Sequence, residues 1–536
     1  MKKSLQTTSC SVKSDTRNMS KIYSYEEALK DSIDYFNGDD LAAKVFLDKY
    51  ALRDKKGEIL ENEPSKMHNR LAAEFARIEK GKFKNPLSQD ELFTLFSKFE
   101  RLVPQGSPMF GIGNNFHTVS ISNCFVLDTP EDSYNSILDV DKQLVNISKR
   151  RGGVGIDLSK LRPKGSVTNN AAKSSTGIVS WMERYSNSIR EVGQHGRRGA
   201  LMLTLNIHHP DVLEFATVKN DNTKVTGANI SLSLTKEFLD AVKEDRDYEL
   251  RFPVNYKETG ETPKVSKLVK AKDVWKTIIH SAWLRAEPGL LMWDNILTGP
   301  ADCYDKYKAV STNPCSEIAM CSLESCRLLA INLFGYVKNP FTKKAYFDYD
   351  FFYSDTKVAQ RLMDDIVDLE SEKIDQILQK IQEDPEDYEI KRSEITLWTK
   401  IKQLNDECRR TGLGITALAD TLAALGIKYG AEESIEETEK IYKNLKLAAY
   451  ESSVEMAEEL GNFKDYNSDT EKDNQFLLRI KEEKPGLYHK MQKVGRRNIA
   501  LTTTAPTGSV SILTQTSSGI EPVFNLGYKR RKKINP

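Results

Sequence analysis

Residues Leu201-Met202-Leu203-Thr204-Leu205-Asn206-Ile207 carry the clearest strand pattern in the chain, because leucine or isoleucine occupies every second position. An apolar stripe at helical spacing precedes this run and ends before Gly193, a helix stop signal: Ile178, Trp181, Met182, Tyr185, Ile189 and Val192. The apolar run Cys124-Phe125-Val126-Leu127 predicts a further strand. Strands that alternate with helices in this way indicate an α/β architecture with mainly parallel strands.

The N-terminal part of the chain has a different, helical character. Ser24 with Glu27, and Ser88 with Glu91, each match a capping box at a helix start. We therefore predict an N-terminal helical domain over residues 22–104, preceded by a disordered lead over residues 1–21. Residues 105–536 form the predicted α/β domain, in which the highly charged stretch 355–405 is expected to form surface helices.

Composition excludes several classes of protein. The 78 Lys and Arg residues balance 77 Asp and Glu residues, so no nucleic-acid or membrane-surface partner is indicated. No apolar run approaches the ~18 residues of a transmembrane helix, and residues 1–21 have no apolar segment typical of a secretory signal. We therefore expect a cytoplasmic protein. The seven cysteines are odd in number and sparse, which argues against a disulfide framework and for redox or metal chemistry.

Asn313-Pro314-Cys315-Ser316-Glu317 places three reactive groups on one short segment. In an extended or looped conformation Asn313, Cys315 and Glu317 point to the same side. A carboxylate can act as general base, an amide can hold a hydroxyl group, and a thiol can perform redox or radical chemistry. The alternative for this motif taken alone is a loop with a buried cysteine.

Metal sites are not expected at either of the two places where cysteines or histidines lie close together in the sequence. A zinc site at Cys315, Cys321 and Cys326 would lack any C-x-x-C pair, and these spacings fit no common zinc module. His208 and His209 precede Pro210 and Asp211, which favours a turn at the end of a strand over a metal site.

Three glycine-containing segments are candidates for close approach or for anion binding. Residues 505–511, Ala-Pro-Thr-Gly-Ser-Val-Ser, can present backbone N–H groups to a phosphate. Residues 151–157, Arg-Gly-Gly-Val-Gly-Ile-Asp, lack a dinucleotide fingerprint and indicate a tight turn where backbone segments meet. Residues 193–199 combine Arg197 and Arg198 in a glycine-bordered loop that suits an anionic ligand.

These motifs, in this order, resemble the catalytic large subunit of ribonucleotide reductase. The matching segments are Ser122-Asn123-Cys124-Phe125-Val126-Leu127, Arg151-Gly152-Gly153-Val154-Gly155-Ile156, Asn313-Pro314-Cys315-Ser316-Glu317, Pro506-Thr507-Gly508-Ser509-Val510-Ser511 and Gly519-Ile520-Glu521-Pro522-Val523-Phe524. The resemblance runs from residue 22 to the last residue. It implies a ten-stranded α/β barrel of two half-barrels, here incomplete at its C-terminal end, with a central loop that carries a radical cysteine.

The resemblance also implies an activity, the thiyl-radical reduction of ribonucleotides to deoxyribonucleotides for DNA synthesis. Cys315 resembles the thiyl-radical residue, Glu317 the base that deprotonates the 3′-hydroxyl, and Asn313 its hydrogen-bonding companion. Cys124 and Cys326 resemble the pair that delivers two electrons and ends as a disulfide. No resident metal is implied.

Nucleotide-binding residues are implied in two places. The residues that resemble substrate contacts are Ser107, Asn123, Pro506, Thr507, Gly508, Ser509 and Ser511. Asn123 stands where many relatives have a small hydroxyl residue. The residues that resemble contacts to an effector, a deoxynucleoside triphosphate or ATP, are Asp132, Arg162, Gly193, Gln194, Arg197 and Arg198. The family builds this effector site at a homodimer interface, here partly from the helix at 177–192.

Two features favour the adenosylcobalamin-dependent class. These are the short segment between Cys315 and Cys326 and the segment Ser122-Asn123-Cys124-Phe125-Val126-Leu127, which are both similar to those of cobalamin-dependent enzymes. The lack of an N-terminal ATP-binding cone agrees with them. The alternatives are a large subunit that binds no radical cofactor and receives its radical from a metal-bearing partner subunit, or a catalytically incompetent nucleotide-binding fragment.

Relatives continue well past Asn535-Pro536, so we expect a complementing C-terminal polypeptide, and a thioredoxin-type reductant for the active-site disulfide. The basic run 529–533 is expected to be a solvated strand end. The sequence does not decide whether the substrate is a ribonucleoside diphosphate or a ribonucleoside triphosphate.

Overall fold

The computed structural model describes residues 21–192, 199–302, 304–525 and 527. Residues 1–20 of the expected lead, the effector-loop residues Gly193, Gln194, Arg197 and Arg198, and the basic run 529–533 lie outside the described residues. Over the described ranges, no helix is both long enough and apolar enough to span a membrane.

Helices dominate the region before the first long strand. Both predicted capping boxes are confirmed: the Ser24 N–H donates to Glu27 at 2.9 Å, and the Ser88 N–H donates to Glu91 at 2.8 Å. The helices here are α1 (Tyr25–Tyr35), α2 (Asp40–Lys49), α3 (Pro64–Lys82), α4 (Gln89–Phe96) and α5 (Ser107–Gly111). Their apolar faces share one hydrophobic core with strands beyond residue 325. The domain boundary at 104 therefore stays a prediction.

A mainly parallel sheet forms the first half of the α/β region, as the sequence predicted. Its order is β11-β2-β3-β4-β5-β8, with β2 through β8 parallel and β11 antiparallel at the edge. The strands are β2 (Cys124–Val126), β3 (Gly153–Asp157), β4 (Leu201–Asn206), β5 (Asn229–Leu234), β8 (Gly289–Met292) and β11 (Ser325–Cys326). The predicted strands at 124 and 201 and the predicted helix at 178 are confirmed. The helices of this half are α6 (Tyr134–Ser148), α7 (Ile178–Glu191), α8 (Val212–Thr217), α9 (Lys236–Lys243) and α11 (Ala271–Arg285).

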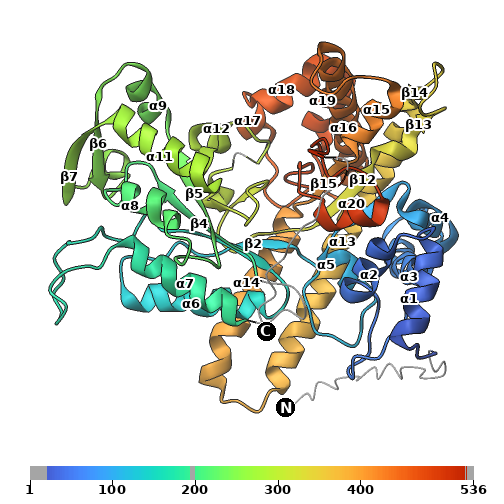
Figure 1. Ribbon diagram of the computed structural model, residues 1–536, viewed down its shortest axis with the longest axis horizontal. Coiled ribbons are helices and arrows are strands. Elements are labelled where there is room, and N and C mark those ends of the chain that lie inside the picture. The colour runs from blue at the N-terminus through green and yellow to red at the C-terminus, as the bar shows by residue number, and fades with distance from the viewer. Residues whose placement is uncertain (1–20, 193–198, 303, 526, 528–536) are drawn as a thin grey trace, which may run out of the picture.

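A second sheet lies across the molecule from the first (Figure 1). Its order is β1-β12-β15, in which β12 pairs antiparallel with β1 and parallel with β15, and Leu413 of β15 bridges to Thr502. The strands are β1 (Leu102–Pro104), β12 (Leu328–Asn332) and β15 (Gly412–Thr416). The α/β class is therefore confirmed. Within the described ranges the strands pair in one six-stranded sheet, one three-stranded sheet and three two-stranded sheets.

A short hairpin runs between the two sheets. It consists of β9 (Ser311–Thr312) and β10 (Ala319–Met320), with Thr312 opposite Ala319. On one side the Asn229 amide donates to the Pro314 carbonyl oxygen at 2.9 Å. On the other side the Thr503 hydroxyl donates to the Glu317 carbonyl oxygen at 3.0 Å. Both halves of the molecule thus hold the hairpin that carries residues 313–317.

The glycines of segment 151–157 explain how the hairpin fits against the first sheet. Gly153 and Gly155 lie within strand β3, so the predicted tight turn at these positions is wrong, but the close backbone approach is confirmed. A Cβ at Gly155 would stand 1.8 Å from the Thr312 carbonyl oxygen, and one at Gly153 would stand 3.0 Å from the Pro314 ring. Only glycine at 155 leaves room for the hairpin backbone.

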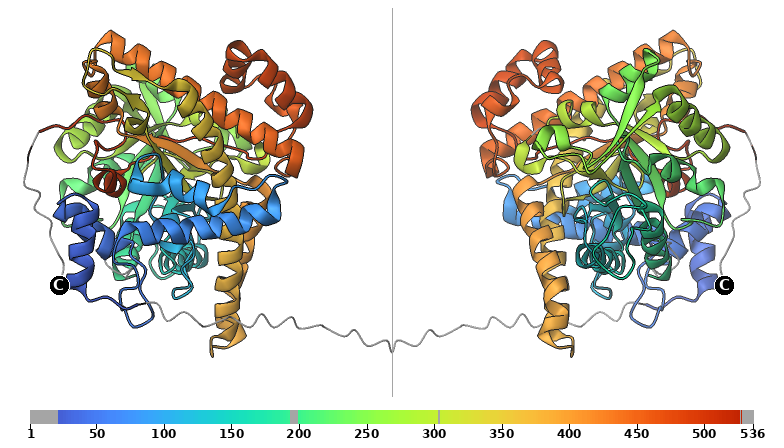
Figure 2. Two further views of the ribbon diagram at one scale, coloured as in Figure 1. Left: turned by 90° about the vertical axis from the view of Figure 1, so that its right-hand side faces the viewer. Right: turned by 90° about the vertical axis from the view of Figure 1, so that its left-hand side faces the viewer.

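The charged stretch 355–405 forms an antiparallel helix pair, α13 (Tyr349–Glu383) and α14 (Tyr388–Cys408), which projects from the body (Figures 1 and 2). The prediction of surface helices is wrong for α13, whose inner face is buried although it carries several acidic residues. The carboxylate of Asp364 can be buried because two cations neutralise its charge. Asp364 lies 2.7 Å from Lys82 and 2.8 Å from Arg409.

Glu370 of α13 connects this helix to the segment that leads into β2. The carboxylate is completely buried and accepts hydrogen bonds from the Ser120 hydroxyl at 2.5 Å, the Ile121 N–H at 2.7 Å and the Ser122 hydroxyl at 2.9 Å. Residues 120–122, which have no regular structure of their own, are thereby fixed just before Cys124.

The remaining elements complete the surface of the two halves. The helices are α10 (Tyr256–Thr259), α12 (Trp293–Thr298), α15 (Leu418–Leu425), α16 (Glu432–Leu460), α17 (Ser468–Glu471), α18 (Gln475–Glu483), α19 (Pro485–Val494) and α20 (Gly508–Thr514). The strands are β6 (Asp247–Phe252), β7 (Val265–Lys270), β13 (Val337–Lys338) and β14 (Tyr346–Phe347).

Gly155→Ala should destabilise the protein, because the added methyl group must displace the backbone of the hairpin. Overpacking of this kind costs about 1–3 kcal/mol or more, and the free energy of unfolding in urea measures it. Gly81→Ala is the matched control, since Gly81 lies in α3 with no heavy atom within 4 Å of the added Cβ. That substitution should be neutral or stabilising. Equal stability of the two variants would contradict the close approach at Gly155.

Glu370→Ala should also destabilise the protein strongly, because three buried donors lose their acceptor, and each unsatisfied group costs about 1–3 kcal/mol. Glu372→Ala is the control on the same helix. Glu372 forms only a surface ion pair with Arg77, and such pairs contribute at most about 1 kcal/mol. Unfolding free energies of both variants test this. A loss for Glu370→Ala no larger than for Glu372→Ala would show that the buried carboxylate does not hold residues 120–122.

Candidate active site

The hairpin tip presents the motif 313–317 in a tight turn. The Ser316 N–H donates to the Asn313 carbonyl oxygen at 3.0 Å, and the Asn313 N–H donates to the Ile318 carbonyl oxygen at 3.1 Å. Ser316 takes a positive φ of 67° to close this turn. Asn313 and Pro314 are buried, whereas Cys315 is exposed at the tip. The predicted position of Cys315 at the tip of an inner loop matches this geometry.

The Asn313 side chain joins the groups that the sequence singled out. Its Nδ2 donates to Glu317 Oε2 at 2.5 Å and to Cys124 Sγ at 3.4 Å. Its Oδ1 accepts the Ile318 N–H at 3.0 Å, which fixes the orientation of the amide. One buried amide therefore connects the carboxylate of the hairpin to a thiol of strand β2.

Cys124 and Cys326 stand directly opposite each other on strands β2 and β11. Residues opposite each other in an antiparallel pair have Cα atoms about 4.5–5.5 Å apart, which lies within the range that a disulfide requires. Both side chains are thiols in this structure. Burial raises the pKa of Cys124 and of Cys326, and Glu317 raises the pKa of Cys124 further. The pair is thus placed for dithiol–disulfide chemistry and stays protonated near neutral pH.

Burial also raises the pKa of Glu317 above its ordinary value, although the hydrogen bond from Asn313 lowers it. A partly buried carboxylate with a raised pKa takes up a proton more readily than one in water. Glu317 therefore has the properties of a general base at the tip.

Arg327 is a residue that sequence reasoning missed. Its guanidinium is completely buried and donates to the Ser122 hydroxyl at 3.2 Å, the Ser325 hydroxyl at 2.5 Å and the Arg410 carbonyl oxygen at 2.8 Å. It thereby braces the two strands that carry Cys124 and Cys326. Glu370 was missed as well, because nothing in a helix pattern reveals which acidic residue turns inward.

Cys321, Cys408, His208 and His209 lie elsewhere, whereas Cys10 and Cys303 lie outside the described residues. The Cys321 thiol contacts Glu324 at 3.4 Å and packs in a cluster with Cys408, away from the pair on β2 and β11. The His209 ring contacts the Leu161 carbonyl oxygen and the Asp211 N–H, and His208 contacts Arg251. Within the described ranges, no three or more His, Cys, Asp or Glu side chains lie close enough together to hold a metal ion.

The hydroxyl-rich segment 506–511 leads into helix α20, which begins at Gly508. Ala505, just before it, packs in one cluster with Cys326 and Ile318, so this segment starts beside the cysteine pair. The Thr507 hydroxyl is held by the Gly519 N–H at 2.6 Å and by Thr416 at 2.9 Å. Gly508 is exposed and Ser509 is half-buried at the helix start, and Ser511 lies one turn further along α20.

Ser107 and Asn123 have different surroundings. Ser107, at the start of α5, is buried, and its hydroxyl has no hydrogen-bond partner among the described residues. The Asn123 amide donates to the Gln105 carbonyl oxygen at 3.0 Å and accepts the Leu328 N–H at 3.2 Å. Asn123 therefore links the two sheets, which accounts for an amide at this position.

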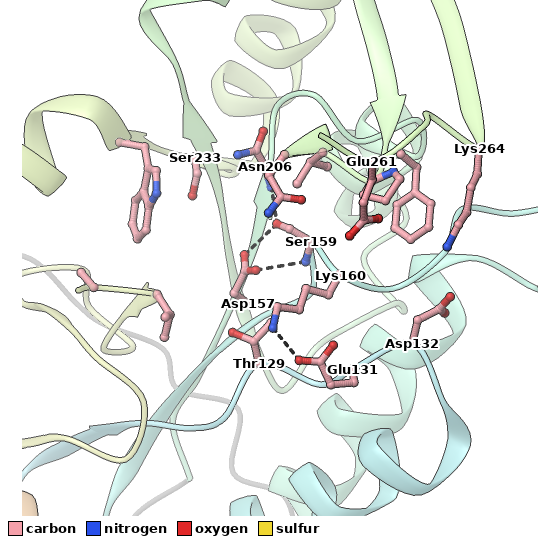
Figure 3. Close-up of a pocket in the computed structure, with 17 residues that line it drawn as sticks. Thr129, Glu131, Asp132, Asp157, Ser159, Lys160, Asn206, Ser233, Glu261 and Lys264 are labelled. Atoms are coloured by element: carbon pink, nitrogen blue, oxygen red, sulfur yellow. Dashed lines mark hydrogen bonds and ion pairs between the residues drawn. The ribbon is translucent and has the colours of Figure 1, made fainter. Parts of the chain in front are cut away.

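Asp132 and Arg162, which follow strands β2 and β3 in the chain, form an ion pair at 2.8 Å. Asp132 lines a cavity of about 490 Å³ at the carboxyl ends of strands β3, β4 and β5, where Asp157, Lys160 and Lys264 also lie (Figure 3). Burial raises the pKa of Asp157 to about 6. This ion pair and cavity are separate from the cysteine cluster.

A further cavity, also of about 490 Å³, opens beside the hairpin and is lined by Tyr304, Thr312, Ser316 and Glu317 among others. This volume is typical of sites for small organic ligands. It gives a ligand direct access to the side of the hairpin tip.

Comparison with known proteins agrees with this geometry. The family model of the ribonucleotide reductase barrel domain matches residues 122–535. A vitamin B12-dependent ribonucleoside-diphosphate reductase of Thermoplasma acidophilum is 32% identical over 80% of this chain and 49% of its own length. A protein of the same name from Mycobacterium tuberculosis is 27% identical over 91% of this chain and 62% of its own length. A ribonucleoside-diphosphate reductase large subunit of Caenorhabditis elegans is 26% identical over 82% of this chain and 56% of its own length.

The chain thus spans about half the length of the first of these relatives and less than two thirds of the others. The match to the family model covers most of the chain and includes the hairpin, the cysteine pair and the segment 506–511. The chain therefore belongs to the ribonucleotide reductase barrel-domain family.

Proposed function

We propose that this chain provides the catalytic centre of a ribonucleotide reductase that converts ribonucleoside diphosphates to deoxyribonucleoside diphosphates. The observation that carries the proposal is the Asn313 amide, which joins the Glu317 carboxylate to the Cys124 thiol while Cys326 stands opposite Cys124. A base, a thiol at an exposed tip and a dithiol pair are the groups that this reaction requires.

The proposed reaction assigns one role to each group. A thiyl radical at Cys315 takes the 3′ hydrogen atom of the ribose, and Glu317 takes the proton of the 3′-hydroxyl. The 2′-hydroxyl leaves as water, and the Cys124–Cys326 dithiol supplies the two electrons and two protons for this reduction, ending as a disulfide. Glu317 returns its proton to the 3′ oxygen, and return of the hydrogen atom from Cys315 to the 3′ carbon regenerates the radical. The raised thiol pKa values of the pair support this role, because the two thiols keep the hydrogens that they must donate.

The substrate phosphates are proposed to bind at residues 506–511, with Thr507, Gly508, Ser509 and Ser511 as the contacts after Pro506. Backbone N–H groups at the start of a helix favour negative charge. The buried, unpartnered hydroxyl of Ser107 supports a ligand contact there. Asn123 is proposed as a positioning residue and not as a phosphate contact, because the Gln105 and Leu328 backbone groups already occupy its amide.

Adenosylcobalamin is the proposed cofactor, in line with the names of the vitamin B12-dependent relatives from Thermoplasma and Mycobacterium. Tyr304, Thr312 and Ser316, which line the cavity beside the hairpin, would contact the adenosyl group of this cofactor. The cofactor supplies the one-electron chemistry that removes the hydrogen atom from the Cys315 thiol. The exposed position of Cys315 is equally compatible with a radical supplied by a metal-bearing partner subunit, which is the alternative that the test below separates.

An effector deoxynucleoside triphosphate or ATP is proposed to bind at Asp132 and Arg162, next to a homodimer interface that includes α6 and α7. Tyr134 is more than half exposed on this face and contacts the Trp181 ring. An exposed tyrosine ring that packs on a half-buried tryptophan supports an interface at this surface. A thioredoxin-type protein is the proposed reductant of the disulfide.

Cys315→Ser should abolish deoxynucleotide formation and leave substrate binding nearly intact, because the O–H bond of serine is too strong for the radical while the size is preserved. Cys124→Ser and Cys326→Ser should still start the reaction but release free base, since no dithiol completes it. Chromatography of the products, with adenosylcobalamin and a polypeptide that includes the further length found in the relatives, measures both outcomes.

Cys408→Ser is the matched control, because Cys408 is buried away from the hairpin and should be dispensable for turnover. Turnover by Cys315→Ser would overturn the proposed mechanism. Wild-type turnover that requires a metal-bearing partner subunit and does not depend on cobalamin would contradict the proposed cofactor. The proposed roles of the cysteines would still stand.

Arg162→Ala should weaken effector binding by about tenfold or more, because a charge-assisted hydrogen bond to phosphate is worth about 1.5–3 kcal/mol. Equilibrium dialysis with a labelled deoxynucleoside triphosphate measures the affinity. Lys142→Ala on α6 is the control, since Lys142 is exposed and pairs only with Asp139 one turn away. Unchanged affinity in Arg162→Ala would remove Arg162 from the effector site.

A further inference from the structure

A groove of about 500 Å³ lies between α15 and the first turns of α16, apart from the hairpin and the cysteine pair. We call it the α15–α16 groove, and its apolar wall consists of Leu418, Leu422, Tyr429, Ile435, Tyr442 and Ile520. Ile435 is 65% exposed and Tyr429 is 43% exposed. An apolar groove that stays open to solvent in this way is typical of a surface that binds another segment.

The rim of the groove is acidic. Among the described residues, Glu439 is the only charged side chain in the lining. It belongs to the acidic stretch of α16, residues 432–439, in which five of the eight residues are glutamates. Glu521 also lies nearby, because its charge adds to burial in raising the pKa of Tyr442.

The lysines around the groove do not balance these carboxylates. The segment that forms this side of the groove carries three of them: Lys428, Lys440 and Lys443. Lys440 lies 3.6 Å from Glu437. Glu436 and Glu439 are exposed, and neither forms an ion pair within the described ranges. Six carboxylates, counting Glu521, thus outnumber three ammonium groups, and this excess favours a cationic segment.

The chain itself contains a segment of complementary chemistry just beyond the groove. Residues 526–533, Leu-Gly-Tyr-Lys-Arg-Arg-Lys-Lys, combine two large apolar side chains with five consecutive cations. Lys529 follows Ile520 of the groove wall by nine residues, which span about 30 Å when extended. The acidic stretch of α16 is about 10 Å long. The cations can therefore reach all of it.

The residues that lead into this segment are already fixed at the groove. The Tyr429 hydroxyl donates to the Ile520 carbonyl oxygen at 2.8 Å. The Leu418 N–H donates to the Gly519 carbonyl oxygen at 3.2 Å. A segment tethered next to its binding surface has a high effective concentration there, so modest contacts are sufficient to hold it.

We propose that the α15–α16 groove binds residues 526–533 of the same chain, with Leu526 and Tyr528 against its apolar wall and the cations 529–533 along the acidic stretch of α16. The basic run is then paired, and is not the solvated strand end expected from the sequence. Binding also restrains Gly519, whose N–H donates to the Thr507 hydroxyl at 2.6 Å. The groove would thereby make residues 506–511 more rigid. Only the importance of that rigidity for substrate phosphates rests on the proposed function.

Cross-linking of the full chain with a carbodiimide tests the contact, because this reagent joins only a carboxylate and an amine that touch. We expect amide bonds between the glutamates of residues 432–439 and the lysines of residues 529–533, identified by mass spectrometry of the peptides. A mixture of isotopically labelled and unlabelled chains distinguishes links within one chain from links between two. Links between chains alone would make a second copy the occupant and overturn the proposal, and so would the absence of any such link.

The rate at which trypsin cleaves after the cations 529–533 measures how firmly the segment is bound, because cleavage requires the released form. Ile435→Ser and Glu439→Gln should each raise this rate about threefold or more. Ile390→Ser and Glu386→Gln are the matched controls on the α13–α14 pair and should leave it unchanged, since Ile390 is 63% exposed and Glu386 is exposed too. Equal rates in the wild type and all four variants would overturn the proposal. Thermal unfolding of each variant distinguishes a released segment from a lost fold.

Hydrogen–deuterium exchange, measured without substrate, tests the restraint on residues 506–511. Exchange of the peptides that cover residues 506–520 should be faster in Ile435→Ser than in the wild type and unchanged in Ile390→Ser. Unchanged exchange in Ile435→Ser, together with faster tryptic cleavage, would overturn the effect on residues 506–511. Loss of deoxynucleotide formation plays no part in these measurements, so their failure and a failure of the proposed function are distinguishable.

Discussion

The side-chain amide of Asn313 is the contact on which the arrangement of the active site depends. It is buried, its oxygen is satisfied by the Ile318 N–H, and its nitrogen bonds both Glu317 and Cys124. A buried amide that lost one of these partners would carry an unsatisfied group, which is costly in a low-dielectric interior. The hairpin and strand β2 are therefore held in one relative position. Glycine at 155 makes this position possible, because any side chain there would push the hairpin away.

Burial gives the site its particular chemistry. Cys124 and Cys326 lie in surroundings that disfavour the thiolate, and their pKa values are raised. Most redox-active cysteines are activated in the opposite sense, by a lowered pKa. In the reaction that we propose, these thiols donate hydrogen, and a raised pKa suits that role better than a nucleophilic one because each thiol keeps its proton. The guanidinium of Arg327 opposes this effect at Cys326, which limits how far the pKa rises.

Local signals in the sequence were sufficient for the elements with a simple amphipathic pattern. The helix at 178 and the strand at 201 each bury a face that the periodicity of the sequence already shows, and both capping boxes lie within four residues. Helix α13 could not be interpreted in this way. Its acidic residues look solvent-exposed in sequence, yet Asp364 and Glu370 are buried because Arg409 and Ser122 reach them from distant segments. Pairing between residues far apart in the chain is invisible to periodicity, and the roles of Arg327 and Glu370 follow from such pairing alone.

The same limit explains why the sequence did not predict the cavity that lies between the end of α2 and the turn before β3. Lys49 and Arg53 belong to the N-terminal helical region, and Lys149 to Arg151 belong to the turn before β3, so no single segment is strongly basic. A nearly neutral chain can still concentrate positive charge where two such segments meet. The contact between α2 and α20 then gives the N-terminal helices a connection to residues 506–511. In this molecule the N-terminal helices are thus part of the surroundings of the site, because they share its core and contribute a cation to its edge.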